Sequence, residues 1–184
     1  MSSLLILTEC YNQPHRRYHT LAHIDHMFAT AQRLGIKLTV SQSLAIWWHD
    51  AVYIPGSPNN EADSVSLMCQ TIPRADNVIL REAANMIQDT AKHFPHGAKS
   101  AIVCDLDMFI LAESDTVHDE YKRNLRLEYS NMSDIDYCLG RVGFLGNMLD
   151  GAIIFHSPQF KQYTERAVML AAQELDELNL ILRP

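Results

Sequence analysis

The sequence predicts an all-α fold in which residues 1–184 form one domain, a bundle of roughly eight helices. Apolar residues recur at helical spacing through most of the chain. Residues with a preference for the N-cap position precede several of these segments, and glycine or proline follows them. The loops are short, no repeat period appears, and no pair of segments reads as strand, turn and strand.

The expected helices span residues 21–35, 39–53, 60–72, 76–94, 99–113, 114–132, 133–151 and 157–182. Gly35 is placed to end the first of them, and Thr39 or Ser41 to cap the second. Ser157, which a proline follows, is the expected N-cap of the last. The mostly apolar stretch 99–113 also fits a buried strand, but its length and its helical neighbours favour a helix.

The composition is that of a soluble globular protein, with 47% hydrophobic and 20% charged residues. The formal net charge of −7 argues against binding to long nucleic acid, which needs a basic surface. The start of the chain has no basic region and no cleavage site, and no apolar run is long enough for a membrane span. None of the four cysteines lies in a CxxC motif. We therefore expect a cytoplasmic protein with reduced thiols and no membrane partner.

The stretch "AIWWHDAVY", residues 45–53, places His49 and Asp50 side by side among aromatic and aliphatic residues. Burying an imidazole and a carboxylate costs several kcal/mol unless something pairs with them. A divalent cation would neutralise the carboxylate and use the imidazole lone pair. His-Asp pairs also occur by chance, so the pair becomes a candidate metal site only if further ligands are available.

Further ligands are available on both sides of this pair. Upstream, "RRYHTLAHIDH" supplies His19, His23 and His26, each of which also reads as a surface histidine at the start of a helix. Downstream, "CDLDMFIL" supplies Asp105 and Asp107. If Asp105 caps a helix, Asp107 is still unexplained in an apolar run.

The order His, His-Asp, Asp over several helices resembles the HD superfamily of metal-dependent phosphohydrolases. The branch of predicted metal-dependent HD phosphohydrolases, whose biological substrate is largely unassigned, is the most similar. The segments that carry this resemblance lie in order between about residues 11 and 170. They are "YNQPHRRYHTLAHI", "WWHDAVY", "NNEADS", "DTAKH", "DLDMFILA", "LRLEY" and "GRVGFL".

The resemblance implies an HD-type helical domain that binds one divalent ion through His23, His49, Asp50 and Asp107. His19 and Asp105 are the alternative ligands, and His93 is an accessory ligand or a phosphate contact. Manganese, iron, cobalt, nickel and zinc suit such a mixed ligand set better than magnesium, which prefers more oxygen atoms.

The remaining candidates would bind or activate a phosphorylated substrate. The resemblance places Arg16 near the metal as a phosphate contact, although an ordinary surface cation fits it equally well. Lys92 fits a surface cation better than a substrate contact, and for Arg126 a surface cation is the alternative. Glu61 either lies in the first turn of a helix or folds back to orient the attacking water.

The sequence thus predicts an enzyme that hydrolyses a small phosphate ester or nucleotide through a metal-activated water. One alternative is a module without catalytic activity that keeps the metal and senses a nucleotide or phosphate. Another is a di-iron oxygenase of the HD type, which needs a richer set of bridging ligands. Both a monomer and a homodimer are compatible with the sequence.

Overall fold

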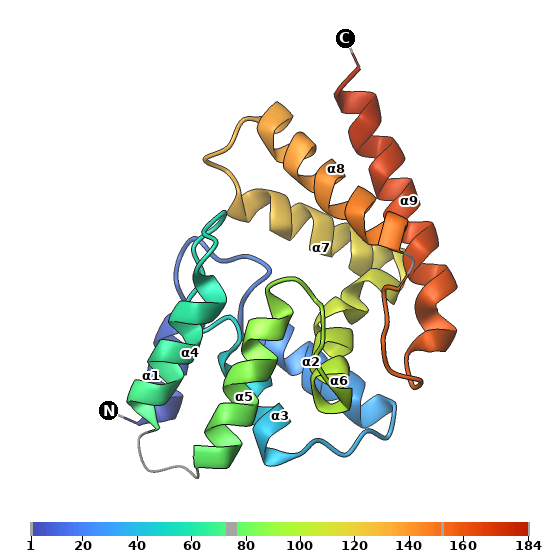
Figure 1. The fold of residues 1–184 in the computed structure, drawn as a ribbon. Coiled ribbons are helices and arrows are strands. Elements are labelled where there is room, and N and C mark those ends of the chain that lie inside the picture. Colours follow the sequence, from blue (N-terminus) through green and yellow to red (C-terminus); the bar gives the residue numbers. More distant parts are fainter. Residues whose placement is uncertain (1, 73–76, 152, 184) are drawn as a thin grey trace. The chain divides into compact units, whose positions relative to one another are not determined.

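The computed structural model describes residues 2–72, 77–151 and 153–183. Within them the chain forms nine α-helices, two short 3₁₀ helices and no strand, which confirms the predicted all-α fold (Figure 1). The chain divides into two compact units, residues 1–107 and residues 108–184. Their union into a single domain stays a prediction. No helix in the described part of the chain is both long and apolar enough to cross a membrane.

The first unit contains six helices that pack around α3 and α5 (Figure 1). Its elements are α1 (Ser3–Tyr11), α2 (Leu21–Arg33), α3 (Val40–Trp48), α4 (Asn60–Thr71), α5 (Asn77–Thr90) and α6 (Ala98–Asp107). Helices α4 and α6 pack on α5, and α2 packs on α6 and α3. Its core consists of side chains that solvent does not reach, among them Ile24, Met27, Ile46, Met68, Ile87 and Leu106.

The second unit consists of η1 (Met108–Ala112), α7 (Asp115–Glu128), α8 (Asp134–Gly151), η2 (Lys161–Tyr163) and α9 (Thr164–Ile181). Helix α9 packs along α8 and on η1, and α7 also contacts η1 (Figure 1). Cys138, Leu145, Ala171 and Leu178 form the buried seam between α8 and α9.

Local sequence signals explain how α2 ends and α3 begins. Gly35 has a φ of +66°, which glycine adopts without steric cost, and it directly follows the C-cap residue of α2. The amides of Gly35 and Ile36 donate to carbonyl oxygens of Gln32 and Ala31, the pair of bonds that defines a Schellman motif. Thr39 then forms a capping box with Gln42, so the expected N-cap at Thr39 is confirmed.

Four helices end earlier than their apolar patterns predict. Among them, α6 ends at Asp107 and is followed by η1, and α7 ends at Glu128. The helix expected over 39–53 ends at Trp48, because the chain beyond it gives its carbonyl groups to a side chain outside the helix. The helix expected over 76–94 ends at Thr90, and the amide of Phe94 turns back to the carbonyl oxygen of Asp89. The early ends of α3 and α5 leave polar residues in turns rather than on helical faces.

The last helix begins later than expected. It starts at Thr164, and Ser157 is not its N-cap but accepts a hydrogen bond from the amide of Phe160 through its carbonyl oxygen. Phe160 is fully buried against Phe109, and this burial holds the segment in a turn. Helix α1 was not predicted from the sequence.

A buried ion pair joins α8 to α9 in the second unit. The guanidinium group of Arg141 donates through Nε and Nη2 to the two carboxylate oxygens of Glu174, at 2.7 and 3.1 Å. His118 Nε2 lies 3.6 Å from the same carboxylate, and burial lowers the pKa of His118. Because each charge is desolvated, either partner left alone would be an uncompensated charge in the core.

We expect Arg141→Met to lower the free energy of unfolding by about 3–5 kcal/mol, because it leaves Glu174 buried and unpaired. The double variant Arg141→Met, Glu174→Met should recover most of this loss. Urea unfolding followed by circular dichroism measures both. Lys99→Met, which breaks the exposed pair between Lys99 and Glu82, is the control and should change stability little. A double variant less stable than Arg141→Met would contradict this account.

Candidate metal centre

His49 stands at the C-terminal end of α3 with its ring orientation set by the helix itself. Its amide still bonds to the carbonyl oxygen of Ala45, and its Nδ1 lies 2.9 Å from the carbonyl oxygen of Ile46. Since a carbonyl oxygen only accepts, Nδ1 carries a hydrogen and donates it. The Nε2 atom is thereby left as the ligand atom of the neutral ring, as in many metal-binding histidines.

Asp50 follows in a turn that Arg16 holds from behind. Arg16 is 2% exposed, and its guanidinium group donates to the carbonyl oxygens of Asp50, Ala51 and His19 at 2.6, 3.0 and 3.0 Å. Its Nε donates to the side chain of Gln13 at 3.1 Å. These bonds fix the backbone of the turn and leave the Asp50 carboxylate to point toward the histidines.

Helix α4 supports the same turn from the other side. The hydroxyl of Ser64, which is fully buried, accepts from the amide of Val52 and lies 3.3 Å from its carbonyl oxygen. The side-chain amide of Asn60 bonds to both the amide and the carbonyl group of Ile54. The backbone after the His-Asp pair is therefore satisfied by side chains, which replaces the helical bonds lost when α3 ends.

Two more donors come from the ends of other helices. His23 lies in the first turn of α2, whose N-cap Thr20 accepts from the amide of Ala22, so the helix starts early enough to position it. Asp107 is the last residue of α6. His23 and His49 are buried, and the side chain of Asp107 is 15% exposed.

The ligand atoms of these residues converge. The Nε2 atoms of His23 and His49 are 3.3 Å apart, and Asp107 Oδ1 lies 3.1 and 3.7 Å from them. His23, His49 and Asp107 form the one group in the described residues whose ligand atoms come together as a metal would require. Asp50 lies outside that group, although its Oδ2 is 3.1 Å from Nε2 of His49 and 3.9 Å from Nε2 of His23.

These distances fit a small divalent cation. Ligand atoms about 2.1 Å from a common ion are about 3.0 Å apart at a right angle and about 3.4 Å apart at the tetrahedral angle. The Nε2 atom of each histidine lies 3.1 Å from one carboxylate oxygen, near the right-angle value, and 3.3 Å from the other Nε2, near the tetrahedral value. Two imidazoles with two carboxylates suit manganese, iron, cobalt, nickel or zinc better than magnesium. The residues present therefore fit a divalent metal ion.

The charges of the group favour a cation. Burial opposes ionisation of Asp107, but His49, His23 and His93 outweigh it and hold the pKa of this carboxyl well below its usual value. Burial lowers the pKa of His23, whereas at His49 the carboxylates of Asp50 and Asp107 overcome burial and raise the pKa well above the usual value. At neutral pH both carboxylates are thus ionised and His23 is neutral, which are the forms that bind metal, whereas His49 keeps a proton that a bound metal ion would displace.

His93 contacts the far side of Asp107. Its Nε2 lies 3.0 Å from Asp107 Oδ2, while Oδ1 of the same carboxylate faces His23 and His49. His93 has a φ of +48°, a left-handed conformation that is uncommon for a residue with a side chain. Backbone strain of this kind costs about 1–2 kcal/mol and concentrates at functional sites. His93 is therefore placed to orient Asp107, whereas its expected roles as an accessory ligand or a phosphate contact stay predictions.

The alternative ligands are not part of the converging group. His19 lies beside it: its ring stacks on Tyr53, with ring centroids 4.1 Å apart, and its charge adds to the larger effect of His49 in lowering the pKa of Asp50. Asp105 is fully buried inside α6, so it does not cap a helix start, and it is not part of the converging group. The geometry favours His23 over His19 and Asp107 over Asp105.

The expected substrate contacts are spread over the two units. Lys92 is exposed beside His93 at the end of α5, within the first unit. Arg126 belongs to α7 of the second unit, where it donates to Asp134 and lies over the ring of Tyr137. Because the guanidinium group of Arg16 is committed to backbone carbonyl groups, the geometry favours a positioning role for it over the expected phosphate contact.

Glu61 lies in the first turn of α4 and is half-buried. Burial raises the pKa of this carboxyl, and the nearby charge of Asp50 raises it further, while His49 acts in the opposite sense. The charges of Asp50 and His49 therefore affect the ionisation of Glu61. A carboxyl with a raised pKa close to such a group is suited to accept a proton.

Sequence reasoning did not find the residues that support the site. Asn60 and Ser64 both lie in the segment "NNEADS", but neither was assigned a role at the site, and their spacing of four residues, which places them on one helical face, was the further signal. The strained conformation of His93 had no signal in the sequence, because histidine is not a residue that marks a left-handed turn as glycine does.

Comparison of the chain with protein-family models, with curated proteins and with solved structures finds no match.

We expect His93→Gly and His93→Ala to weaken metal binding equally, because both remove the imidazole that orients Asp107. They should differ in stability. The free energy of unfolding should be about 1 kcal/mol higher for the glycine variant than for the alanine variant, because only glycine adopts a φ near +48° without strain. Metal titration and urea unfolding of the metal-free proteins provide the two measurements. Equal stability of the two variants would show that the backbone at this position is not strained.

Proposed function

We propose that the protein is a metal-dependent phosphohydrolase that acts on a small phosphate ester or nucleotide. The observation that carries the proposal is the meeting of two buried imidazole Nε2 atoms at 3.3 Å, with ionised carboxylates of Asp107 and Asp50 beside them. A purely structural cluster gains little from facing two imidazoles in this way, whereas a divalent cation satisfies all four groups together. The resemblance to HD phosphohydrolases points to the same chemistry.

His23, His49, Asp107 and Asp50 would hold the ion. When bound, a divalent cation supplies a Lewis acid that polarises a phosphoryl oxygen and lowers the pKa of water. Four protein ligands leave open positions on a six-coordinate ion, so water and a phosphate oxygen have room to approach.

The chain's own residues would complete the reaction. Glu61, with its raised pKa, would accept the proton of the attacking water. His93 would keep Asp107 in the orientation that its neighbours require. The exposed ammonium group of Lys92, next to His93, is the cation of the first unit best placed to meet a phosphate group.

This proposal revises the role of Arg16. Because its guanidinium group holds the carbonyl groups of Asp50 and Ala51, its loss would disturb the metal ligands before it affected any substrate contact. We therefore assign to Arg16 the positioning of the His-Asp turn rather than the binding of phosphate.

Protein stripped with a chelator and reloaded with manganese, iron, cobalt, nickel, zinc or magnesium should hydrolyse members of a panel of phosphomonoesters and nucleotides. His49→Ala and Asp107→Ala should lose both the metal and the activity. At a free metal concentration of about a hundred times Kd, binding should stabilise the wild type by about 2.7 kcal/mol. Elemental analysis, thermal unfolding and phosphate release measure these effects.

His26→Ala is the matched control, since His26 is on α2 three residues after His23 but outside the converging group. It should keep the metal and the activity. Full metal occupancy in His49→Ala would overturn the ligand assignment. A loaded protein that hydrolyses nothing in the panel but binds phosphate compounds would favour the sensing module. Two irons per chain would favour the oxygenase.

Glu61→Gln should keep the metal and lower kcat by about a hundredfold or more, because general-base catalysis contributes at least about that factor. The control is Asp63→Asn, which changes an exposed carboxylate two residues later on α4 and should leave kcat unchanged. Steady-state kinetics with metal-loaded proteins decide the question. A Glu61→Gln enzyme with wild-type kcat would restrict Glu61 to the role of a helix-terminus residue.

A further inference from the structure

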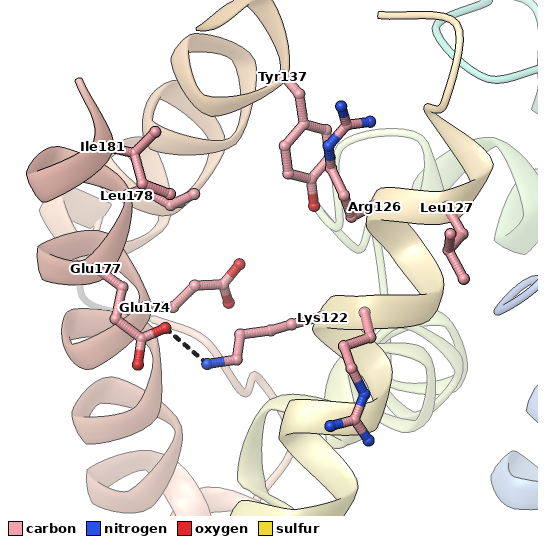
Figure 2. A pocket seen from close by; sticks show the side chains of 9 residues that line it. Lys122, Arg126, Leu127, Tyr137, Glu174, Glu177, Leu178 and Ile181 are labelled. Carbon is pink, nitrogen blue, oxygen red and sulfur yellow. Dashed lines mark hydrogen bonds and ion pairs between the residues drawn. The ribbon is translucent and has the colours of Figure 1, made fainter. Parts of the chain in front are cut away.

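The second unit contains a pocket that the metal centre does not explain. It has a volume of about 460 Å³, within the range of small-molecule sites, and it lies among α7, α8 and α9 (Figure 2). The residues that line it are Lys122, Arg123, Arg126, Leu127, Tyr137, Glu174, Glu177, Leu178 and Ile181. All of them belong to residues 108–184.

Positive charge is in excess among the lining residues. Helix α7 contributes Lys122, Arg123 and Arg126, of which the first and last are four residues apart and share a helix face. Helix α9 contributes Glu174 and Glu177. The carboxylate of Glu174 is already neutralised by its two bonds to Arg141, so it adds little negative potential.

The acids that pair with Lys122 are weak competitors. Glu177 and Asp119 lie 2.8 and 3.0 Å from its ammonium group, but 61% and 56% of their side chains are exposed. Arg126 is paired in the same way with Asp134, whose side chain is 78% exposed. Ion pairs with such exposed carboxylates contribute little to stability, so an anion in the pocket could replace these three carboxylates.

The rest of the lining is apolar or aromatic. Leu127 and Ile181 form an apolar rim, with 54% and 59% of each residue exposed, and this exposure of apolar surface to water is unfavourable. Leu178 is buried. The hydroxyl of Tyr137 points into the pocket (Figure 2). Burial raises the pKa of Tyr137 to about 12, so this hydroxyl keeps its proton and remains a donor.

We propose that this pocket binds a small anion with an apolar body, such as a carboxylate or a phosphate monoester joined to an aliphatic chain. The anionic head would lie between Lys122 and Arg126 and accept from Tyr137, and the apolar body would contact Leu178 and Ile181. The charge excess selects an anion over a cation, and the apolar rim selects an amphiphile over inorganic phosphate. The proposal is independent of the metal centre, whose ligands all lie in the first unit.

Isothermal titration calorimetry of the full chain with decanoate tests the proposal. A chelator is present throughout, so that no metal ion can bind the carboxylate. Decanol and decyltrimethylammonium, which keep the chain and change the head, are titrated alongside below their micelle concentrations. We expect decanoate to bind at one site per chain, decanol to bind more weakly and the cation not to bind.

Variants locate the site. Lys122→Met and Arg126→Met keep the apolar stem of each side chain and remove its charge, and each should weaken decanoate binding by about tenfold. Glu177→Gln should instead tighten binding, because it removes one of the two carboxylates that compete for Lys122. Ile181→Asp, at an exposed position, should weaken binding without unfolding the protein.

Lys161→Met is the matched control, because it removes one exposed lysine charge of the same unit at a position outside the pocket. It should bind decanoate as the wild type does. The proposal is overturned if decanoate does not bind, if the three heads bind equally, or if a folded Lys122→Met, Arg126→Met protein binds decanoate with wild-type affinity. Circular dichroism confirms that each variant is folded.

Discussion

The first unit depends on the burial of two imidazoles and two carboxylates at one point. Such groups cost several kcal/mol each when they leave water without partners. Here each imidazole lies within about 3–4 Å of a carboxylate, and both histidines are almost fully buried. The helices around them are therefore constrained in register, because a shift by one residue would bury these groups without compensation.

The donors lie at helix ends, and this location has a physical reason. In the middle of a helix, neighbouring side chains diverge by about 100°, whereas at an end the backbone can turn and present successive residues to one point. His49 and Asp50 use the C-terminal end of α3, and Asp107 uses that of α6. The carbonyl groups of the turn that follows α3 are bonded by the side chains of Arg16, Asn60 and Ser64, all of which are buried.

The sequence predicted much of this architecture, for identifiable reasons. Helical periodicity and caps such as Thr39 and Gly35 are local signals, so the all-α class and the starts of α2 and α3 could be predicted. The ends of α3 and α5 could not be predicted. Arg16, which is distant in the sequence, binds the chain after α3, and the turn after α5 is held by Asp89 and contains no glycine. For the site, motif order favoured His23 and Asp107. The burial and strain that support this choice arise only when the chain is folded.

Arg16 binds the turn through main-chain oxygen atoms, which every amino acid possesses. It is therefore insensitive to the identity of the side chains that it supports. A relative of this protein in which His49 or Asp50 had been substituted would keep the same bend of the chain. Loss of the candidate ligands and loss of the fold are in this way separable during evolution, and the bend of the chain could persist without them.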